Sequence, residues 1–304
     1  MAPRVAVATS GGRDSTALLH CTLRQAAPLG VAVVALQVHH GLMADADRWQ
    51  AQVERQARRW GAGFESRRVQ GKPAAGDSVE AWARRARHRA LAEMAQGAGC
   101  TLLLLAHHRR DQAETWLLQA LRSGGPRGLS AMPLRAERYG VLWARPWLDL
   151  PRKIIESYVR RHRIAFVDDA SNTDVRFARN RIRLQVWPAL LQAFPHAEIA
   201  LSGAARQAQQ AARLAEETAA IDVPMVSDGT GLSVARWNAL PPARRRNALQ
   251  AWLSGLPGAW TEGVPGSLVD RLVLELPRAR GRSRWPLPLG ELHLHRGVLQ
   301  QRRD

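Results

Sequence analysis

The stretch RVAVATSGGRDSTALLH, residues 4–20, decides the fold of the first part of the chain. Its apolar start predicts a β-strand, and its end predicts an amphipathic helix. Between them lies Ser10-Gly11-Gly12-Arg13-Asp14-Ser15, whose adjacent glycines permit a tight turn and a close approach of backbone N–H groups to a ligand. The positive end of the following helix points to the same place. This arrangement is typical of a loop that binds pyrophosphate or the phosphates of a nucleotide.

The loop differs from the two common glycine-rich nucleotide motifs. G-x-x-x-x-G-K-[ST] requires a lysine where Arg13-Asp14 stand, and the glycine spacing is not that of G-x-G-x-x-G. The alternative without a ligand is a Gly-Ser turn in which Asp14 caps an ordinary helix. The combination of strand, six-residue motif and helix favours phosphate binding over that turn.

The charge of the chain indicates an anionic partner. The 304 residues carry a formal net charge of +18, and Lys72 and Lys153 are the only lysines, so the basic groups are almost all arginine. Guanidinium groups bind phosphates through two hydrogen bonds and stack on bases, which favours nucleic acid. A GC-rich genome would explain the ratio of arginine to lysine but not the excess of basic over acidic residues.

The two cysteines, Cys21 and Cys100, are far apart and form no C-x-x-C motif, which argues against a disulfide scaffold, a zinc site or a redox pair. The sequence shows neither a signal-peptide pattern nor an apolar run near 18 residues. We therefore expect a cytoplasmic protein with no membrane partner.

Strand and helix patterns alternate through the first half of the chain, which predicts an α/β fold: a parallel sheet with helices on both faces. Strand-like runs cover residues 4–9, 31–38, 64–69, 101–106 and 141–145, and helical patterns cover 15–25, 46–60, 78–96 and 111–123. Ligands bind such sheets at the carboxyl ends of the strands. The polar segments SGGRDS, HHGLM (39–43) and HHRRDQAET (107–115) all fall at predicted strand ends.

The pattern changes after Pro195, and we expect three regions. Residues 1–195 form the α/β domain, residues 196–221 form a linker helix rich in alanine and glutamine, and residues 222–304 form a second, mainly helical domain. The last region contains tryptophans at 237, 252, 260 and 285 and arginine clusters at 244–246 and 278–284.

Asp111 and Glu114 are the acidic residues with the clearest candidate chemistry. They lie three residues apart, so on a helix they share a face near its N-terminus. Such a pair can hold Mg²⁺ through its waters or bind an ammonium group. The alternative is a capping arrangement in which Asp111 caps the helix and Glu114 completes a capping box. The spacing alone leaves both interpretations open.

Three further segments carry basic residues. Arg179 and Arg183 lie four apart on a predicted helix and suit phosphate binding, although a solvated charge run is the alternative. The glycine-rich segment 121–132 contains Arg122 and is either an active-site loop or a connector. The helix with Glu80, Arg84 and Arg87 reads by itself as a salt-bridged surface helix.

Together these motifs resemble one family. S-G-G-x-D-S is similar to the loop of the PP-loop ATP pyrophosphatases. The ordered set SGGRDS, VHHGLM, EAWARRAR, HHRRDQAET, RSGGPRGL and DASN followed by RNRIR resembles the bacterial tRNA(Ile)-lysidine synthetases. The resemblance covers residues 8–183, and the remainder looks like the linker helix and first C-terminal domain of that family.

The resemblance implies a reaction. With ATP and Mg²⁺, the enzyme would adenylate the C2 carbonyl oxygen of the wobble cytidine in the CAU anticodon of tRNA(Ile). The ε-amine of L-lysine would then displace AMP, so that the codon read changes from AUG to AUA. The ligands would be tRNA(Ile) and L-lysine, and the chain would be compatible with a homodimer.

The resemblance also implies roles for individual residues. The catalytic residues would be Asp14, Asp111 and Glu114, and Asp111 would also be a metal ligand. The nucleotide would be bound by Ser10, Gly11, Gly12, Arg13, Asp14, Ser15 and His40. The tRNA or lysine would be bound by Arg84, Arg87, Arg122, Asn172, Arg179, Asn180 and Arg183.

Two features depart from the family. The family usually has two acidic residues where this chain has Arg110-Asp111, and longer members carry a further C-terminal domain. The competing interpretations are a tRNA thiolating enzyme, which would need catalytic cysteines, and an amide-forming synthetase, which would not explain the basic charge. A third is a tRNA-binding relative that has lost catalysis through Arg110.

Overall fold

The computed structural model describes residues 2–39, 46–69, 71, 79–122, 125–167, 173–229, 231–257, 264–279, 283–288 and 290–302. The chain divides into two compact units. The first comprises Met1–Gly124 and Gly128–Arg206, and the second comprises Gly125–Arg127 and Gln207–Asp304. His40 and Asn172, both named as candidate site residues from the sequence, lie outside the described residues.

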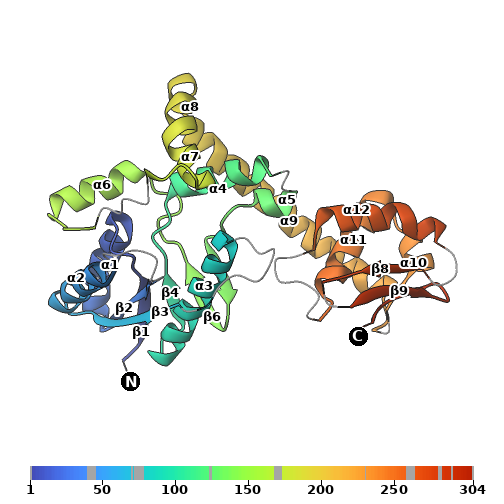
Figure 1. Ribbon diagram of the computed structural model, residues 1–304, viewed down its shortest axis with the longest axis horizontal. Coiled ribbons are helices and arrows are strands. Elements are labelled where there is room, and N and C mark those ends of the chain that lie inside the picture. Colours follow the sequence, from blue (N-terminus) through green and yellow to red (C-terminus); the bar gives the residue numbers. More distant parts are fainter. Residues whose placement is uncertain are drawn as a thin grey trace. The chain divides into compact units, whose positions relative to one another are not determined.

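The first unit is built on a six-stranded sheet with the order β3-β2-β1-β4-β6-β5. Figure 1 shows this sheet among its helices, coloured from blue to green. Its strands are β1 (Arg4–Ala8), β2 (Ala32–His39), β3 (Gly63–Arg68), β4 (Leu102–Leu104), β5 (Arg135–Arg138) and β6 (Val141–Ala144). The strands pair in parallel except β5, which is antiparallel to β6. The predicted parallel α/β fold is confirmed, and the antiparallel edge strand is an addition that the sequence analysis did not predict.

Helices cover both faces of this sheet because its strands are apolar on both sides. Val5 and Val7 point to the face covered by α1 (Arg13–Ala26) and α2 (Ala46–Arg59), where they join one buried cluster. Ala6 belongs to the cluster on the opposite face, under α3 (Val79–Gly97). This alternation along a single strand fixes which residues lie in each core.

The remaining elements of the first unit follow the strands. They are α4 (Arg109–Ala120), α6 (Arg152–Arg161), α7 (Ala178–Arg181), a π-helical segment (Ile182–Val186), α8 (Trp187–Ala193) and the first part of α9 (Ala197–Val226). The short α5 (Pro126–Leu129) precedes β5. The helix predicted over 196–221 is present and extends to Val226.

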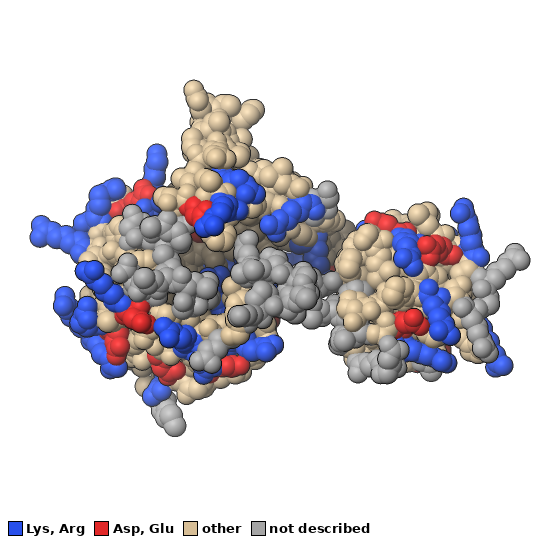
Figure 2. Space-filling view, viewed as in Figure 1, with Lys and Arg blue, Asp and Glu red and all other residues tan. Residues whose placement is uncertain are grey.

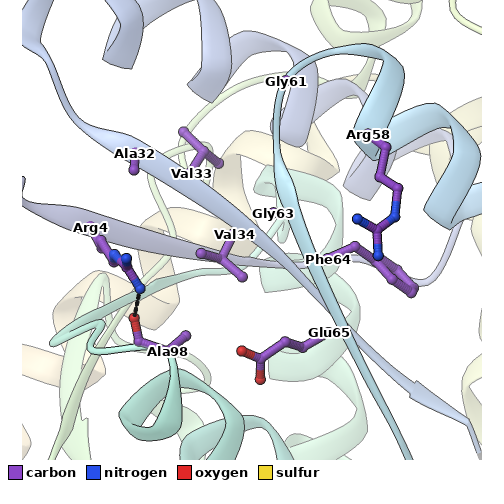
Figure 3. A pocket seen from close by; sticks show the side chains of 10 residues that line it. All are labelled: Arg4, Ala32, Val33, Val34, Arg58, Gly61, Gly63, Phe64, Glu65 and Ala98. Atoms are coloured by element: carbon purple, nitrogen blue, oxygen red, sulfur yellow. Dashed lines mark hydrogen bonds between the residues drawn. The ribbon is translucent and has the colours of Figure 1, made fainter.

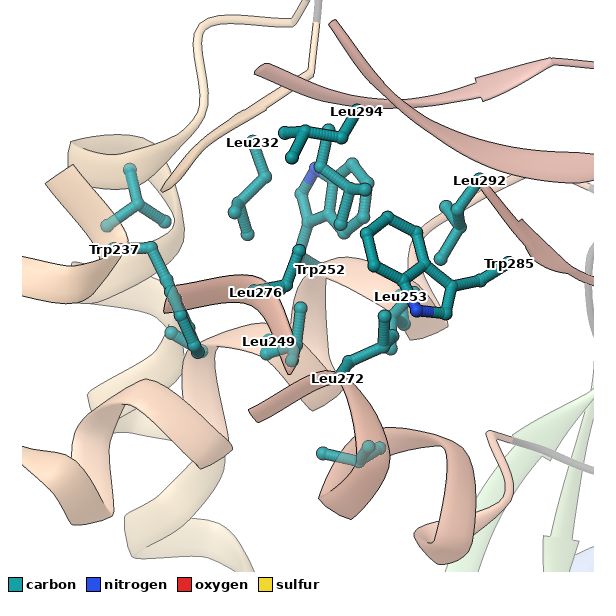
Figure 4. Packing of buried hydrophobic residues seen from close by; sticks show 14 of the residues in the cluster. Leu232, Trp237, Leu249, Trp252, Leu253, Leu272, Leu276, Trp285, Leu292 and Leu294 are labelled. Atoms are coloured by element: carbon teal, nitrogen blue, oxygen red, sulfur yellow. The ribbon is translucent and has the colours of Figure 1, made fainter. Parts of the chain in front are cut away.

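The second unit combines helices with a small antiparallel sheet in the order β7-β10-β9-β8. Its strands are β7 (Leu232–Ser233), β8 (Arg284–Pro286), β9 (Glu291–His295) and β10 (Val298–Arg302), and its helices after α9 are α10 (Val234–Ala239), α11 (Pro242–Ser254) and α12 (Gly266–Glu275). Trp237, Trp252 and Trp285 pack into one apolar core with Leu292 and Leu294 of β9 (Figure 4). The sheet was not predicted, although the alternation in Glu-Leu-His-Leu-His is the pattern of a strand with one buried face.

The strand order places a topological switch at the centre of the first unit. β1 lies between β2 and β4. The chain leaves β1 towards β2 and leaves β4 towards the side of β6, so these two connections run in opposite directions. A crevice opens at the carboxyl ends of strands at such a point, and ligands bind there in open α/β sheets. SGGRDS follows β1 and HHRRDQAET follows β4, so both motifs flank this crevice.

Candidate functional site

The loop after β1 has the geometry of a phosphate cradle. Gly11 has φ +83°, in the left-handed region, and a Cβ there would lie 2.7 Å from Val53 Cγ2, so a side chain has no room. Ser10 Oγ accepts from the Gly12 amide at 3.3 Å, and Ser15 Oγ accepts from the Ser10 amide at 3.2 Å. The two hydroxyls therefore hold the loop in shape.

The helix that follows offers unpaired donors to a ligand. Gly12 is the N-cap of α1, and no side chain of the described residues caps this helix end. The first-turn amides of an α-helix have no intrahelical acceptor and carry the positive end of the helix dipole. A diphosphate group fits this cradle, because its oxygens supply the acceptors that the first-turn amides need.

Asp14 lies on the first turn of α1 and faces the end of β4. Its carboxylate accepts from Arg13 Nε at 3.0 Å, and Oδ2 lies 3.6 Å from His108 Nε2. Burial alone would raise the pKa of Asp14, but His108 and Arg13 outweigh it and hold this pKa well below its ordinary value. Arg13 also bonds Glu156 of α6 at 3.0 Å, so its side chain is engaged within the protein.

His108 joins the two motifs across the crevice. It is the N-cap of α4: its Nδ1 accepts from the Asp111 amide at 3.4 Å, and its own amide donates to Asp111 Oδ2 at 3.0 Å. The capping box exists, but with His108 at the cap and Asp111 as its partner, rather than with Asp111 and Glu114. His108 Nε2 lies 3.5 Å from Asp111 Oδ2, so one imidazole faces both Asp111 and Asp14.

The structure brings Asp111 and Glu114 together with Arg179 and Arg183. Arg183 Nη2 bonds Asp111 Oδ1 at 2.8 Å and its Nε bonds Glu114 Oε2 at 2.8 Å. Arg179 bonds the same two carboxylates at 3.3 and 3.1 Å. Burial raises the pKa of Asp111, yet His108 and Arg179 lower it more strongly, so the group stays ionised. The acidic pair and the arginine pair, predicted separately, form one cluster.

Arg110 stands where the family usually has an acidic residue, and it is accommodated by Trp187. Its guanidinium lies 5.0 Å from the centre of the Trp187 ring, and Arg110 Nε lies 3.6 Å from Glu114 Oε1. A stacked cation beside a buried carboxylate is a stable arrangement. Trp187 received no role from the sequence, because it lies 77 positions from Arg110 and belongs to no motif.

The acidic residues of the site differ in how well they suit Mg²⁺. Both oxygens of Asp111 already accept hydrogen bonds from Arg179, Arg183 or the His108 amide, and no group of three metal-ligating side chains occurs among the residues that the structure describes. Mg²⁺ commonly needs only one or two carboxylates when a substrate supplies phosphate oxygens. Asp14 fits that requirement better than Asp111, because it lies beside the phosphate cradle and the contacts of its Oδ2, to Arg13 Nη2 at 3.5 Å and His108 Nε2 at 3.6 Å, are long.

The other predicted residues that the structure describes lie on α3, after α4 and in α7. Arg84 and Arg87 lie on α3 with exposed side chains, and Arg122 is exposed just after α4. Asn180 is buried in α7, and its Nδ2 donates to the Asp174 carbonyl at 2.9 Å.

A separate pocket lies at the other end of the sheet, next to the amino ends of β1, β2 and β3 (Figure 3). Arg4, Arg58 and Glu65 are among its lining residues, and Arg4 Nη1 bonds the Ala98 carbonyl at 3.0 Å. Its position is opposite to the edge where parallel sheets bind ligands, so it is not the candidate site.

Basic side chains are spread over both units on the face shown in Figure 2, where they are more frequent than acidic ones. None of the described helices is both long and apolar enough to cross a membrane.

Comparisons with known proteins agree with this geometry. A PP-loop domain family matches residues 1–190, and a family described as the TilS substrate binding domain matches residues 232–300. A U34-tRNA thiolase, NcsA from Methanococcus maripaludis, has a similar fold with a TM-score of 0.59 at 12% identity, over 68% of this chain and 72% of that one.

Curated relatives share far more sequence. A tRNA(Ile)-lysidine synthase of Ralstonia nicotianae is 49% identical over 83% of this chain and 55% of its own length. A tRNA(Ile)-lysidine synthase of Burkholderia mallei is 44% identical over 84% of this chain and 53% of its own length. The chain thus spans about half the length of these relatives. It covers 75% of a tRNA(Ile)-lysidine synthase of Bordetella bronchiseptica at 41% identity. The chain belongs to the tRNA(Ile)-lysidine synthase family.

Proposed function

We propose that this chain is a ligase that joins L-lysine to C2 of the wobble cytidine in the CAU anticodon of tRNA(Ile), with conversion of ATP to AMP and pyrophosphate. The observation that carries the proposal is the uncapped N-terminus of α1 behind the Ser10–Ser15 loop, set beside the acidic residues of α4. Membership in the family supports it.

In the first half-reaction, the cytidine O2 attacks the α-phosphorus of ATP, and the bond to the pyrophosphate oxygen breaks. The amides of α1 and the Ser10 and Ser15 hydroxyls would hold the leaving pyrophosphate. Asp14, kept ionised by its neighbours, would hold the accompanying Mg²⁺, which neutralises phosphate charge when bound. His108 fixes Asp14 from the side of β4.

In the second half-reaction, the ε-amine of lysine attacks C2, the C2–O bond breaks, AMP leaves and the amine loses a proton. Glu114 and Asp111 would orient the ammonium group or accept its proton. Arg179 and Arg183 already form ion pairs with both carboxylates. One of these arginines must therefore release a carboxylate and bind another anion before the ammonium group is bound. No protein nucleophile is required, because lysine is the attacking group.

The second unit would recognise the tRNA, since residues 232–300 match a substrate-binding family. The test is a nucleoside digest of a CAU-anticodon tRNA(Ile) transcript after incubation with the full chain, ATP, Mg²⁺ and lysine. We expect lysidine in place of the wobble cytidine. A digest with unmodified cytidine, while the Ralstonia relative modifies the same transcript, would reject the proposal.

A further inference from the structure

Arg110 is a largely buried cation that has no role in the account above. Its side chain is 21% exposed, and its guanidinium lies 5.0 Å from the centre of the Trp187 ring. Its Nε is buried and forms no hydrogen bond with any described residue. A guanidinium that stacks on an aromatic ring keeps its edge free to donate hydrogen bonds. Arg110 therefore offers a donor that the described part of the chain does not use.

Glu114, the acid that forms an ion pair with Arg110, has closer partners. Arg183 Nε donates to both Glu114 oxygens, at 2.9 and 2.8 Å, and Arg179 Nε donates to Oε2 at 3.1 Å. The approach of Arg110 Nε to this carboxylate, 3.6 Å, is longer than each of these and too long for a hydrogen bond. The charge of Glu114 is therefore balanced without Arg110.

The second acid near Arg110 also has an arginine of its own. Burial lowers the pKa of Arg110, and Glu114 opposes this effect. Arg152 acts in the same direction as burial, and Glu198 acts against it. Glu198 accepts from Arg109 Nε at 2.9 Å, so it is already neutralised by the residue next to Arg110 in the chain. Neither acid is thus reserved for Arg110.

Three arginines surround two acids at the start of α4. They are Arg110, Arg179 and Arg183, around Asp111 and Glu114. Arg110 forms the longest of these ion pairs and is the cation left over. Trp187 beside it is fully buried, and its Nε1 also lacks a hydrogen-bond partner among the described residues. Buried donors are rarely left unpaired, and an anion stabilises a surplus cation, so these groups indicate an anion site.

The neighbours of Arg110 indicate which anion it would bind. Arg183 bonds Asp111 Oδ1 and Glu114 Oε2 at 2.8 Å each, so an ammonium group in its place can contact both carboxylates. Lysine carries a carboxylate on the same short chain as its ε-ammonium group. Arg110 and Glu114 lie four residues apart on one face of α4, and a guanidinium binds a carboxylate through two parallel hydrogen bonds.

We propose that Arg110 binds the α-carboxylate of lysine while Asp111 and Glu114 hold its ε-ammonium group. This inference rests on the proposed function. The family usually has an acidic residue at position 110, which would repel that carboxylate, so the contact belongs to this chain and not to the family pattern. Trp187 holds the guanidinium in place without using its donors. Amines that lack a carboxylate should therefore bind weakly.

The test measures binding, so it does not depend on turnover. Equilibrium dialysis compares labelled L-lysine with L-lysinamide, which keeps both amino groups but has no carboxylate, in the presence of Mg²⁺, α,β-methylene-ATP and the CAU tRNA(Ile) transcript. We expect the wild type to bind lysine about tenfold more tightly than lysinamide. Arg110→Gln should bind both ligands with the affinity that the wild type has for lysinamide.

Arg109→Gln is the matched control. It removes the same charge from the same helical turn, but the Arg109 guanidinium is bonded to Glu198. This variant should keep the preference for lysine. Arg110→Lys, which keeps the charge, should retain part of the preference and replaces Arg110→Gln if that variant does not fold. Melting temperatures establish folding for all three variants.

The outcomes separate the inference from the proposed function. Equal binding of both ligands by the wild type, or no binding of lysine, would overturn the inference. An equal loss for both ligands in Arg110→Gln would do the same, and so would weaker binding of the transcript with the lysine preference intact, which would assign Arg110 to an RNA phosphate. The expected preference in a chain that forms no lysidine would reject the proposed function and leave the inference standing.

Discussion

Asp14 connects the two sides of the crevice, the loop after β1 and the start of α4. It extends from the first turn of α1, next to the phosphate cradle, and meets His108 at the start of α4. Its lowered pKa keeps it charged over the whole physiological range, although burial opposes this. A permanently ionised carboxylate beside a phosphate cradle is suited to hold Mg²⁺ together with ATP and unsuited to donate a proton.

The first prediction concerns this loop. Ser10→Ala and Asp14→Asn are each expected to slow tRNA-dependent pyrophosphate release about a hundredfold, or about 3 kcal/mol, because each removes a contact to the triphosphate or its metal. Binding of tRNA should change little, because we expect exposed arginines, and not Ser10 or Asp14, to contact the tRNA. Pyrophosphate release at the wild-type rate in both variants would show that the loop does not hold ATP.

The second prediction separates the half-reactions at Glu114. Glu114→Gln is expected to raise the KM for lysine or to stop lysine transfer, because the amide cannot attract an ammonium group. Pyrophosphate release should remain measurable. Since Arg179 and Arg183 both bond this carboxylate, melting temperatures of the variant and the wild type provide the control for folding. Equal loss of both half-reactions in a folded variant would instead give Glu114 a structural role or a role at the metal.

At the level of elements, the cradle exists because β1 and α1 meet through a turn that only glycine tolerates. The Gly11 carbonyl accepts from the Val167 amide at 2.9 Å, so the segment after α6 closes over this turn. Val53 of α2 fills the space beside Gly11. α2 and the segment after α6 thus hold the loop in a fixed shape, so the amides of α1 are in position before ATP binds.

Gly11→Ala tests this packing, with Gly61→Ala as its control. Both glycines have a positive φ, +83° and +85°, but an alanine Cβ at Gly61 would meet nothing within 4 Å. We expect Gly61→Ala to cost about 1 kcal/mol from backbone strain, and Gly11→Ala to cost about 3 kcal/mol because Val53 must also move. Thermal unfolding measures both. Equal losses would show that Val53 does not pack against the turn.

The pH dependence of stability tests the surroundings of α3. The pKa of His88 falls from its ordinary value of 6.5 to about 3 in the folded protein. Between these pH values the unfolded chain binds a proton that the folded chain does not, so stability decreases as pH falls from about 6.5 towards 3. The loss from His88 is ~1 kcal/mol per pH unit.

His107 contributes a second loss over the same range, because its pKa is also lowered to about 3. The carboxylates whose pKa values are lowered, such as Asp111, act only below about pH 4. Urea unfolding of the wild type and His88→Phe from pH 7 to 4.5 should therefore show a clearly smaller slope for the variant. Parallel slopes would mean that His88 is protonated in the folded protein.

At the scale of the whole molecule, the parallel strands of the first unit could be predicted from the sequence. Continuous apolar runs mark β1, β2 and β4, and the motifs after β1 and β4 meet because parallel strands end at one edge. β5 and the small strands of the second unit were missed, since they are short and mostly polar.

Contacts between distant residues were beyond prediction from the sequence. Arg179 and Arg183 follow Glu114 by 65 and 69 positions, and spacing within one segment says nothing about which segment packs against it. The sequence indicated phosphate binding for these arginines, and Mg²⁺ or ammonium binding for the acids, but for the same reason it could not show that the two groups bond each other. Arg110 over Trp187 is another contact of this kind.

The family assignment joins these scales in one central claim, that ATP cleavage at the β1 loop drives transfer of lysine to tRNA. The most direct measurement incubates the full chain with labelled lysine, labelled ATP, Mg²⁺ and the CAU tRNA(Ile) transcript, and counts both products. We predict one AMP released for each lysine attached, with neither product formed when tRNA is left out. Steady AMP formation without lysine attached to tRNA, or no reaction where the Ralstonia relative is active, would contradict the account.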